Sequence, residues 1–151
     1  MMDNTFKITT HSEEETIEVA QNLESEKFPN MVICLNGDLG SGKTVFTKGF
    51  ASAMAIEEIT SPTFNIIKEY VGELPLYHMD VYRTNGRVDE LGLDEYFNKG
   101  GVTIIEWAEM IEDCLPKERL DITFKITGEN TRVMVITPHG DKYLSVCEDA
   151  L

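Results

Sequence analysis

Runs of apolar residues separated by polar segments divide the chain into predicted strands and helices. Two short unbroken apolar runs, residues 31–35 and 102–105, predict core strands. Two alternating runs, residues 120–126 and 132–136, are joined by Gly128-Glu129-Asn130 and predict a β-hairpin. The C-terminal part of the chain is therefore expected to be antiparallel sheet.

Helices are predicted where a capping signal or helical spacing follows these patterns. Ser12 fits the first position of a capping box, with Glu15 three residues on, and the helix that it starts runs toward Ser25. Residues 45–54 can wind as a second helix. A third is expected over residues 108–114, just before a proline.

Three further strands and two uncertain segments complete the pattern. Residues 6–9 predict a short edge strand. Residues 65–71 and 76–82 predict two strands that pair antiparallel, because the turn between them is short. Residues 85–97 form a polar, partly helical stretch, and residues 143–151 receive no assignment.

One segment carries a recognisable chemical motif. Residues 37–44 read Gly-Asp-Leu-Gly-Ser-Gly-Lys-Thr and fit G-x-x-x-x-G-K-[ST], the phosphate-binding loop, between a predicted strand and a predicted helix. The glycines let backbone N–H groups approach an anion at the positive end of the helix dipole. Lys43 is then expected to reach the β- and γ-phosphates, and the Thr44 hydroxyl to bind Mg²⁺.

Nucleotide hydrolysis or transfer also needs an acidic residue near the metal, usually at the end of an apolar strand. Asp80 follows the alternating residues 76–79, Glu106 follows the apolar residues 102–105, and at least one of them is expected at the metal site. Glu106 is alternatively expected to orient or deprotonate a water. Thr63 lies in a proline-restricted segment, where it can sense Mg²⁺ and the γ-phosphate as switch segments do.

Three other residues have open roles. His78 lies two residues before Asp80, on the same strand face, and is interpreted as a structural histidine. Arg83 is expected either to stabilise transferred charge or to pair with a surface acid. Trp107, the single tryptophan, is expected either in the core or as a flat face near the nucleotide or a partner.

Composition narrows the class of protein. The 151 residues carry a net charge of −14, which argues against direct non-specific binding to nucleic acid. The acidity suits a basic partner, although solubility alone explains it equally well. No apolar run is long enough to span a membrane and the start lacks a signal-peptide pattern, so a cytoplasmic protein is expected. The three cysteines are scattered, which suggests neither a disulfide framework nor a structural zinc site.

The ordered motifs resemble a known family. The phosphate-loop motif is followed by Ser61-Pro62-Thr63-Phe64, His78-x-Asp80-x-Tyr82-Arg83, Leu91-Gly92-Leu93-Asp94-Glu95-Tyr96 and Ile105-Glu106-Trp107-Ala108-Glu109. This set looks like the TsaE family, small bacterial P-loop ATPases needed for the threonylcarbamoyladenosine modification of tRNA. The resemblance covers the chain from about the first predicted helix to beyond Trp107.

The resemblance implies both a fold and a role. It implies one P-loop NTPase-like α/β domain over residues 1–151, with three layers, a mixed sheet and antiparallel hairpins. It also implies ATP and Mg²⁺ as cofactors, slow hydrolysis, and a partner complex of TsaB and TsaD proteins that ATP hydrolysis resets between turnovers. Contact with tRNA is expected only indirectly, through that complex.

The resemblance also assigns site residues and shows two departures. Ser41 stands where the family often has Ala, and Val45 where a second Thr is common. Catalytic roles fall on Lys43, Asp80 and Glu106, and the Mg²⁺ site on Thr44, Asp80 and Glu106. Nucleotide binding is assigned to Asp38, Leu39, Gly40, Ser41, Gly42, Lys43, Thr44, Val45, Thr63 and Trp107.

Two alternatives remain open at this point. A small-molecule kinase also pairs a phosphate loop with a chain of this length, but such kinases usually close a basic lid over the phosphates. Only four arginines are present, and no basic cluster follows the loop. The second alternative is a slow nucleotide-dependent switch, in which Thr63 matters more than Glu106.

Overall fold

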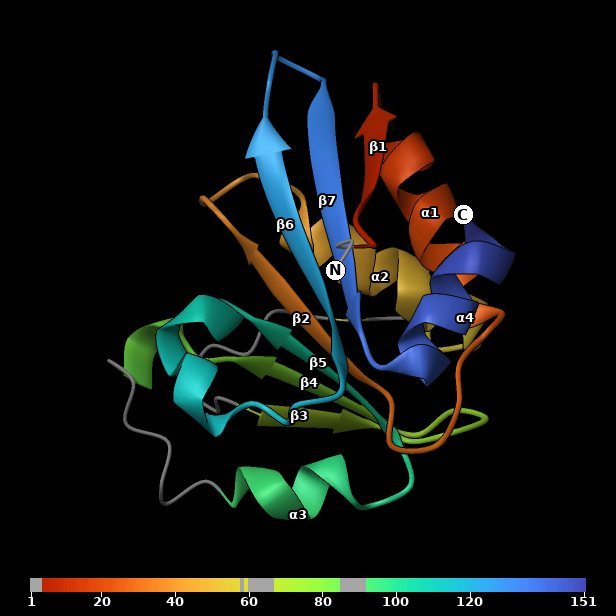
Figure 1. The fold of residues 1–151 in the computed structure, drawn as a ribbon, viewed down its shortest axis with the longest axis vertical. Coiled ribbons are helices and arrows are strands. Elements are labelled where there is room, and N and C mark those ends of the chain that lie inside the picture. The colour runs from red at the N-terminus through yellow and green to blue at the C-terminus, as the bar shows by residue number, and fades with distance from the viewer. Residues whose placement is uncertain (1–3, 58, 60–66, 85–91) are drawn as a thin grey trace.

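A seven-stranded mixed sheet forms the centre of the protein in a computed structural model, which describes residues 4–57, 59, 67–84 and 92–151 (Figure 1). The strand order is β1-β7-β6-β2-β5-β4-β3. The strands are β1 (Phe6–Thr10), β2 (Val32–Gly37), β3 (Ile67–Tyr70), β4 (Leu76–Asp80), β5 (Val102–Glu106), β6 (Arg119–Ile126) and β7 (Arg132–His139). The helices are α1 (Glu13–Glu24), α2 (Lys43–Ala53), α3 (Leu93–Phe97) and α4 (Asp141–Ala150), with 3-10 helices η1 (Tyr82–Thr84) and η3 (Ala108–Cys114).

The direction of the strands changes from the middle of the sheet to its edges. β2 pairs in parallel with both β5 and β6, and β4 pairs in parallel with β5. β3 pairs antiparallel with β4, β6 with β7, and β7 with β1. The predicted mixed sheet and antiparallel hairpins are therefore confirmed, as is the edge strand at the N-terminus.

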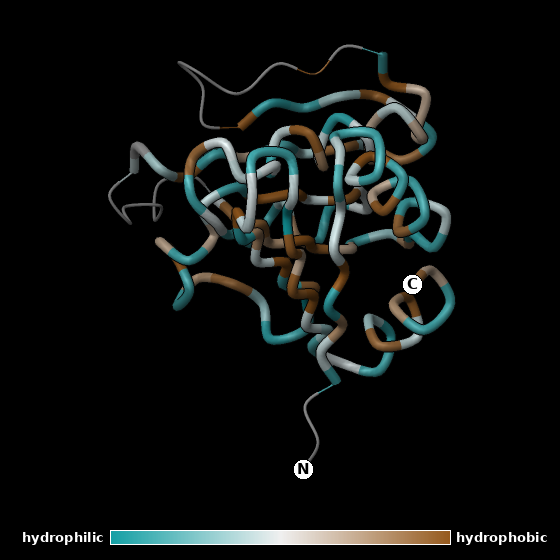
Figure 2. Tube along the Cα trace, turned by 90° about the horizontal axis from the view of Figure 1, so that it is seen from above, coloured by the Kyte–Doolittle hydropathy of each residue, from teal (hydrophilic) through white to brown (hydrophobic). Residues whose placement is uncertain are grey.

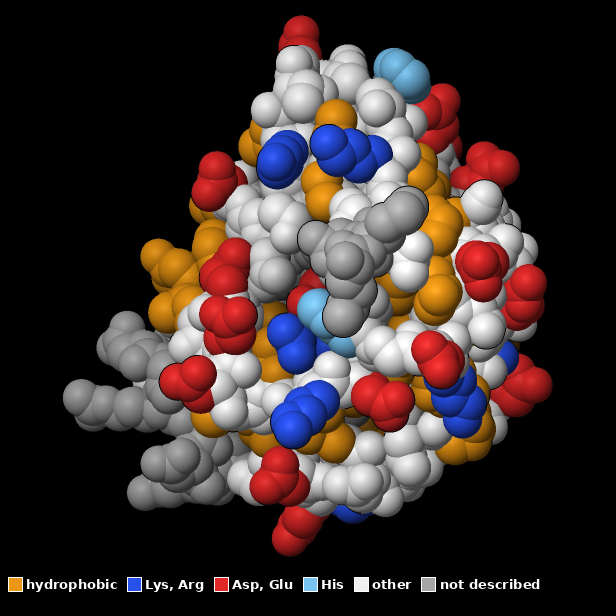
Figure 3. Space-filling model, in the orientation of Figure 1, with side chains coloured by type: hydrophobic (Ala, Val, Ile, Leu, Met, Phe, Trp, Pro, Cys, Tyr) orange, Lys and Arg blue, Asp and Glu red, His pale blue; other side chains and the backbone are white. Residues whose placement is uncertain are grey.

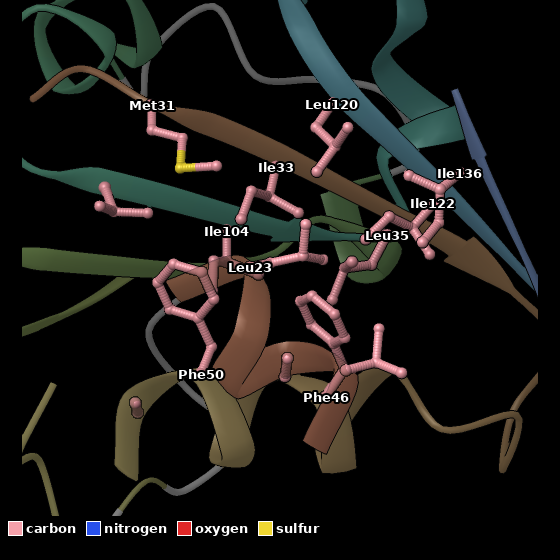
Figure 4. Close-up of a cluster of buried hydrophobic side chains, with 14 of the residues drawn as sticks. Leu23, Met31, Ile33, Leu35, Phe46, Phe50, Ile104, Leu120, Ile122 and Ile136 are labelled. Carbon is pink, nitrogen blue, oxygen red and sulfur yellow. The ribbon is translucent and has the colours of Figure 1, made fainter. Parts of the chain in front are cut away.

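Helices cover both faces of the sheet and enclose two hydrophobic clusters. On one face, Leu23 of α1 and Phe46 and Phe50 of α2 pack against Ile33 and Leu35 of β2 (Figure 4). On the other face, a second cluster contains residues of α3 and η3 together with the opposite side chains of β2, β4 and β5. The hydrophobic stretches of the trace run through the middle of the molecule, whereas the helices alternate between hydrophobic and hydrophilic (Figure 2). The layered α/β arrangement follows from this two-sided burial.

Local capping explains where α1 begins. The Ser12 hydroxyl accepts a hydrogen bond from the Glu15 amide at 3.1 Å. The Glu15 carboxylate accepts one from the His11 amide at 2.8 Å, one residue before the position that a standard capping box uses. The predicted helix start is therefore confirmed.

Several segments differ from the sequence-based expectation or extend it. The strand expected at 76–82 ends at Asp80, and Tyr82–Thr84 form η1 instead. Residues 141–150 form α4, and the hydroxyl oxygen of its buried Tyr143 accepts a hydrogen bond from the Val32 amide of the sheet at 2.8 Å. η3 is a 3-10 helix with non-helical angles at Ile111 rather than a regular α-helix. β7 continues through Pro138, which is tolerated because β1 pairs with β7 only as far as Ile136.

Several expected features fall outside the described residues. These are the segment 61–64 with Thr63, the first two residues of the strand expected at 65–71, and residues 85–91 of the polar stretch. Of the helices in the described part of the chain, none is long and apolar enough to cross a membrane.

Gly49 allows α1 and α2 to approach closely. A Cβ atom at this position would lie 2.9 Å from the Cα atom of Ile17, which is backbone of α1. Gly49→Ala is therefore expected to destabilise the protein by about 1–3 kcal/mol through overpacking. Helix propensity alone predicts the opposite sign, a gain of about 1 kcal/mol.

Urea unfolding at equilibrium measures this effect. Lys48→Ala, on the exposed side of the same helix, is the control and should change the free energy of unfolding by less than about 0.5 kcal/mol. A Gly49→Ala protein that is more stable than the wild type would show that the two helices can separate without cost.

Candidate functional site

The phosphate-binding loop connects β2 to α2 at the carboxyl end of a central parallel strand. Gly37 and Gly42 have φ angles of 141° and 116°, which favour glycine. A Cβ atom at Gly37 would lie 2.7 Å from the carbonyl oxygen of Phe124 in the neighbouring strand β6. The loop is therefore tied to the sheet at its start, and α2 begins at Lys43 with its amide groups directed at the loop.

A cavity of about 710 Å³ opens over this loop. Its size is within the range of small-molecule and cofactor sites. On the face shown in Figure 3, acidic side chains are spread over the surface with fewer basic side chains between them. The cavity is lined by Ser12, Glu13, Thr16, Leu39, Gly40, Gly42, Lys43, Thr44, Val45, Asp80, Tyr82, Glu106, Trp107, Glu129, Asn130 and Arg132.

Lys43 is buried beneath the cavity and bonded to its own loop. Its ammonium group donates to the carbonyl oxygens of Gly37 at 2.5 Å and Asp38 at 3.0 Å, and lies 3.9 Å from the ring centre of Trp107. Burial lowers the pKa of Lys43, while the nearby carboxylates, Glu106 first among them, oppose this shift. The loop thus holds the cation in place through carbonyl oxygens that a phosphate oxygen could replace.

Glu106 lies at the end of β5 and is only 3% exposed. One of its carboxylate oxygens, Oε1, accepts a hydrogen bond from the Thr44 hydroxyl at 3.1 Å, and the other, Oε2, lies 2.5 Å from Nε2 of His78. Because Thr44 uses its proton toward Glu106, the lone pairs of its oxygen are free for a cation.

Asp80 ends the neighbouring strand β4 and is the register partner of Glu106. Its carboxylate oxygen Oδ1 accepts a hydrogen bond from the Tyr82 amide at 3.0 Å. Burial raises the pKa of Asp80, and repulsion from Glu106 raises it further, while the Tyr82 hydrogen bond opposes both. The parallel register therefore places two carboxylates side by side at the edge of the cavity.

Trp107 directly follows Glu106 and has a left-handed backbone, with φ of 64°. This conformation is uncommon for a bulky residue and persists only where the surroundings enforce it. The Trp107 amide donates to the Leu35 carbonyl at 2.9 Å, and its ring centre lies 4.7 Å from that of Tyr82. The turn after β5 thus brings the indole ring to the wall of the cavity, beside Lys43.

The donor atoms fit a hard divalent cation. The Thr44 hydroxyl and the Asp80 and Glu106 carboxylates supply only oxygen, the ligand that Mg²⁺ prefers. Within residues 4–57, 59, 67–84 and 92–151, no three His, Cys, Asp or Glu side chains are grouped so as to hold a metal ion by themselves. Such a site needs further oxygens from water or phosphate, as Mg²⁺ sites usually do.

The structure brings most of the sequence-predicted residues to one cavity. Leu39, Gly40, Gly42, Lys43, Thr44, Val45, Asp80, Glu106 and Trp107 all contribute to its lining. Asp38 and Ser41 are not among the lining residues. The Asp38 carbonyl accepts from Lys43, and the Ser41 hydroxyl is buried beside Gly37. Thr63 and the side chain of Arg83 lie outside what the structure describes.

Other residues of the site have no signal in the sequence. Ser12, Glu13 and Thr16 reach the cavity from the start of α1, and Glu129, Asn130 and Arg132 reach it from the β6–β7 hairpin. The Arg132 guanidinium donates to the Gly40 carbonyl at 3.3 Å. These segments are distant from the loop along the chain, so no local spacing indicates their proximity. His78 had a weak signal, since it shares a strand face with Asp80.

Glu109 also belongs to the surroundings of the loop. Its amide donates to the Asn36 side chain at 2.9 Å, and burial raises the pKa of its carboxyl group while the charge of Lys43 opposes the shift. η3 is thereby joined to the end of β2.

The loop, the parallel strands beside it and the two strand-end carboxylates define a P-loop NTPase-like α/β protein. A family profile described as "Threonylcarbamoyl adenosine biosynthesis protein TsaE" matches residues 10–134. The chain belongs to the TsaE family, as the sequence motifs had predicted.

Individual relatives agree with this assignment. The chain is 50% identical over 146 residues to the "tRNA threonylcarbamoyladenosine biosynthesis protein TsaE" of Bacillus subtilis (strain 168), covering 95% of this chain and 92% of that protein. It is 37% identical over 132 residues to the protein of the same name from Rickettsia bellii (strain RML369-C), covering 84% and 91%. A solved structure, "Crystal structure of Bacillus subtilus YdiB", superposes with a TM-score of 0.88 at 46% identity and covers 99% of this chain and 96% of that one.

The pair of neighbouring carboxylates has a consequence for stability. Because the pKa of folded Asp80 is raised above its ordinary value of 3.8, ionised Asp80 weakens the folded state at pH 7. Asp80→Asn keeps the side-chain oxygen for the Tyr82 amide and removes the charge. The variant is therefore expected to unfold at higher urea concentration than the wild type at pH 7.

The pH dependence gives the sign of this effect. The stabilisation should fade as the pH falls from the raised pKa to 3.8, and it should be absent well below pH 3.8, where Asp80 is protonated in both the folded and the unfolded state. Asp113→Asn makes the same change of net charge at an exposed residue and serves as the control. If both variants shift the urea midpoint equally, the effect comes from net charge and not from the Asp80–Glu106 pair.

Proposed function

We propose that this protein is a Mg²⁺-dependent ATPase that acts in the biosynthesis of N6-threonylcarbamoyladenosine in tRNA. The observation that carries the proposal is the hydrogen bond from the Thr44 hydroxyl of the phosphate-binding loop to the buried Glu106 carboxylate. A P-loop hydroxyl that binds Mg²⁺ next to an acidic residue is the recurring arrangement of nucleotide-hydrolysing P-loop proteins. Membership of the TsaE family and the names of its relatives support the pathway.

In this proposal the loop binds the phosphates of ATP. Amide groups of residues 40–44 face the anion at the N-terminus of α2. Lys43 exchanges its hydrogen bonds to the Gly37 and Asp38 carbonyls for hydrogen bonds to phosphate oxygens. The phosphate oxygens are negatively charged, whereas the carbonyls are neutral, so the new hydrogen bonds are stronger. Leu39, Val45 and Trp107 contribute apolar walls, and Thr63 is proposed to respond to the γ-phosphate.

The two carboxylates have different roles in this scheme. Both oxygens of Glu106 are engaged, by Thr44 and by His78, so Glu106 orients the Thr44 hydroxyl and helps to hold Mg²⁺. A Mg²⁺ ion held there would supply positive charge to the phosphate oxygens. Oδ2 of Asp80 is free of the Tyr82 amide, and burial raises the pKa of this carboxyl group, which makes it a better proton acceptor than an ordinary aspartate. Asp80 thus takes the proton of the attacking water.

The proposed partners are the TsaB-like and TsaD-like proteins of the threonylcarbamoyl-transfer complex. ATP hydrolysis remodels or resets that complex in the cytoplasm, and tRNA is contacted only through it. The net charge of −14 supports an indirect role, because such a surface repels a phosphate backbone.

Lys43→Ala is expected to weaken ATP binding by about 10- to 100-fold. The physical reason is the loss of charge-assisted hydrogen bonds, each of which contributes about 1.5–3 kcal/mol. Isothermal titration calorimetry measures the affinity without relying on the tryptophan beside Lys43. Lys48→Ala, five residues further along the same helix and exposed, is the charge-matched control. Equal ATP affinity in both variants would refute the phosphate-loop assignment.

Addition of purified TsaB-like and TsaD-like proteins is expected to change the rate of phosphate release from ATP. Asp80→Asn should still bind ATP but release phosphate at least about 100-fold more slowly, with or without the partners, since it lacks the proton acceptor. Asp113→Asn, which removes one negative charge at an exposed residue, is again the control and should release phosphate at the wild-type rate. Rapid phosphoryl transfer to a small metabolite without any partner would instead favour a kinase.

A further inference from the structure

His78 lies below the cavity and contacts the carboxylate at its floor. The side chain of His78 is fully buried in β4, at 0% exposure, and Nε2 is 2.5 Å from Oε2 of Glu106. The second oxygen of that carboxylate accepts the Thr44 hydroxyl. Glu106 is thus held between the phosphate-binding loop on one side and an imidazole on the other.

The parallel register explains how this contact arises. His78 is the register partner of Ile104 on β5, and Asp80 is the partner of Glu106. His78 therefore lies one side-chain step behind the two carboxylates on the same face of the sheet. It is not among the residues that line the cavity, so it reaches a bound nucleotide only through Glu106.

The surroundings of the second ring nitrogen, Nδ1, indicate which of the two nitrogens of His78 carries the hydrogen. Nδ1 is buried and has no hydrogen-bond partner within the described residues. Leu76 and Ile104, its neighbours on this face, are fully buried apolar residues. A proton on Nδ1 would be left without an acceptor, which is costly in a buried site. A neutral ring with its proton on Nε2 instead donates to Glu106 and leaves no donor unpaired.

We propose that His78 is a positioning residue, which as the Nε2–H tautomer fixes the Glu106 carboxylate so that its other oxygen faces Thr44 and the Mg²⁺ site. This inference rests on the proposed function. Hydrogen-bond partners of metal-binding carboxylates and histidines orient them, and their loss typically costs about 10- to 100-fold in metal affinity or activity. His78 therefore sets the gain in ATP affinity that Mg²⁺ provides, without contacting ATP.

The tautomer is tested directly on the nucleotide-free chain. Long-range ¹H–¹⁵N correlation spectra of the ¹⁵N-labelled protein at neutral pH report which ring nitrogen of each of the three histidines carries hydrogen. His78→Gln assigns the signals by their disappearance. We expect the hydrogen on Nε2 and a bare Nδ1. A hydrogen on Nδ1 with a bare Nε2 would mean that Glu106 is the donor of the pair, and hydrogens on both nitrogens would mean a charged imidazolium. Either result would overturn the inference.

The functional arm compares ATP affinity with and without Mg²⁺, by calorimetry. His78→Leu should reduce the gain that Mg²⁺ provides by about 10- to 100-fold and leave the Mg²⁺-free affinity unchanged. His78→Gln, which keeps an N–H donor at a similar reach, should lie closer to the wild type than to His78→Leu. The matched control for His78→Leu is His139→Leu, which removes another histidine–carboxylate contact, to Asp121 at 2.7 Å, outside the cavity lining.

The outcomes separate this inference from the proposed function. A wild-type chain that binds ATP, with His78→Leu showing the full Mg²⁺ effect, overturns only the positioning role. Equal defects in His78→Leu and His78→Gln also overturn it, because they indicate packing rather than a donated hydrogen bond. A wild-type chain without ATP affinity contradicts the proposed function itself. If His78→Leu does not fold, the inference is tested by the tautomer seen in the spectra and by the Mg²⁺ effect on ATP affinity in His78→Gln. That effect should be close to the wild-type value.

Discussion

Parallel pairing of β2, β5 and β4 is the constraint on which the site depends. Parallel strands end at the same edge of a sheet, so the phosphate-binding loop after β2, Glu106 at the end of β5 and Asp80 at the end of β4 meet there. The register pairs Leu35 with Glu106, and Glu106 with Asp80. A shift of one residue would turn every one of these side chains to the opposite face. Burial of Ile33, Leu35 and Ile104 under α2 opposes such a shift, so the hydrophobic core also sets the spacing of the polar groups.

The same register places two negatively charged side chains next to each other at the edge of the sheet, where their repulsion destabilises the fold. Glu106 and Asp80 are adjacent and removed from water to different degrees, and the pKa of Asp80 is raised as a result. Lys43 provides a compensating positive charge, but its ammonium group donates its hydrogen bonds to the Gly37 and Asp38 carbonyls and not to the carboxylates. A site arranged in this way is less stable than an apolar replacement would be, which is typical where sequence rules for stability give way to function.

Local patterns were sufficient for the features that depend on neighbouring residues. The loop motif, the cap at Ser12 and the two strands beside Asp80 and Glu106 follow from spacing and apolar runs, and the structure contains each of them, although β4 ends two residues earlier than expected. The approach of Arg132 to Gly40 depends on how the β6–β7 hairpin extends past the loop, which no short segment determines. α4 had no assignment from the sequence, and its place in the fold is fixed by the contact of the Tyr143 hydroxyl with the Val32 amide. The kink at Ile111 likewise reflects tertiary packing rather than propensity.

The strained backbone at Trp107 connects the end of β5 to β2 and to the phosphate-binding loop. Its left-handed conformation ends β5 immediately after Glu106, returns the amide to the Leu35 carbonyl of β2, and sets the indole ring against the Lys43 ammonium. Any ligand that draws this ammonium toward the cavity removes the donor from Gly37 and Asp38 and the cation from the indole face at once. Those lost contacts oppose binding, so only a ligand with strong anionic oxygens can displace them. The free loop therefore discriminates between ligands before any of them touches the carboxylates.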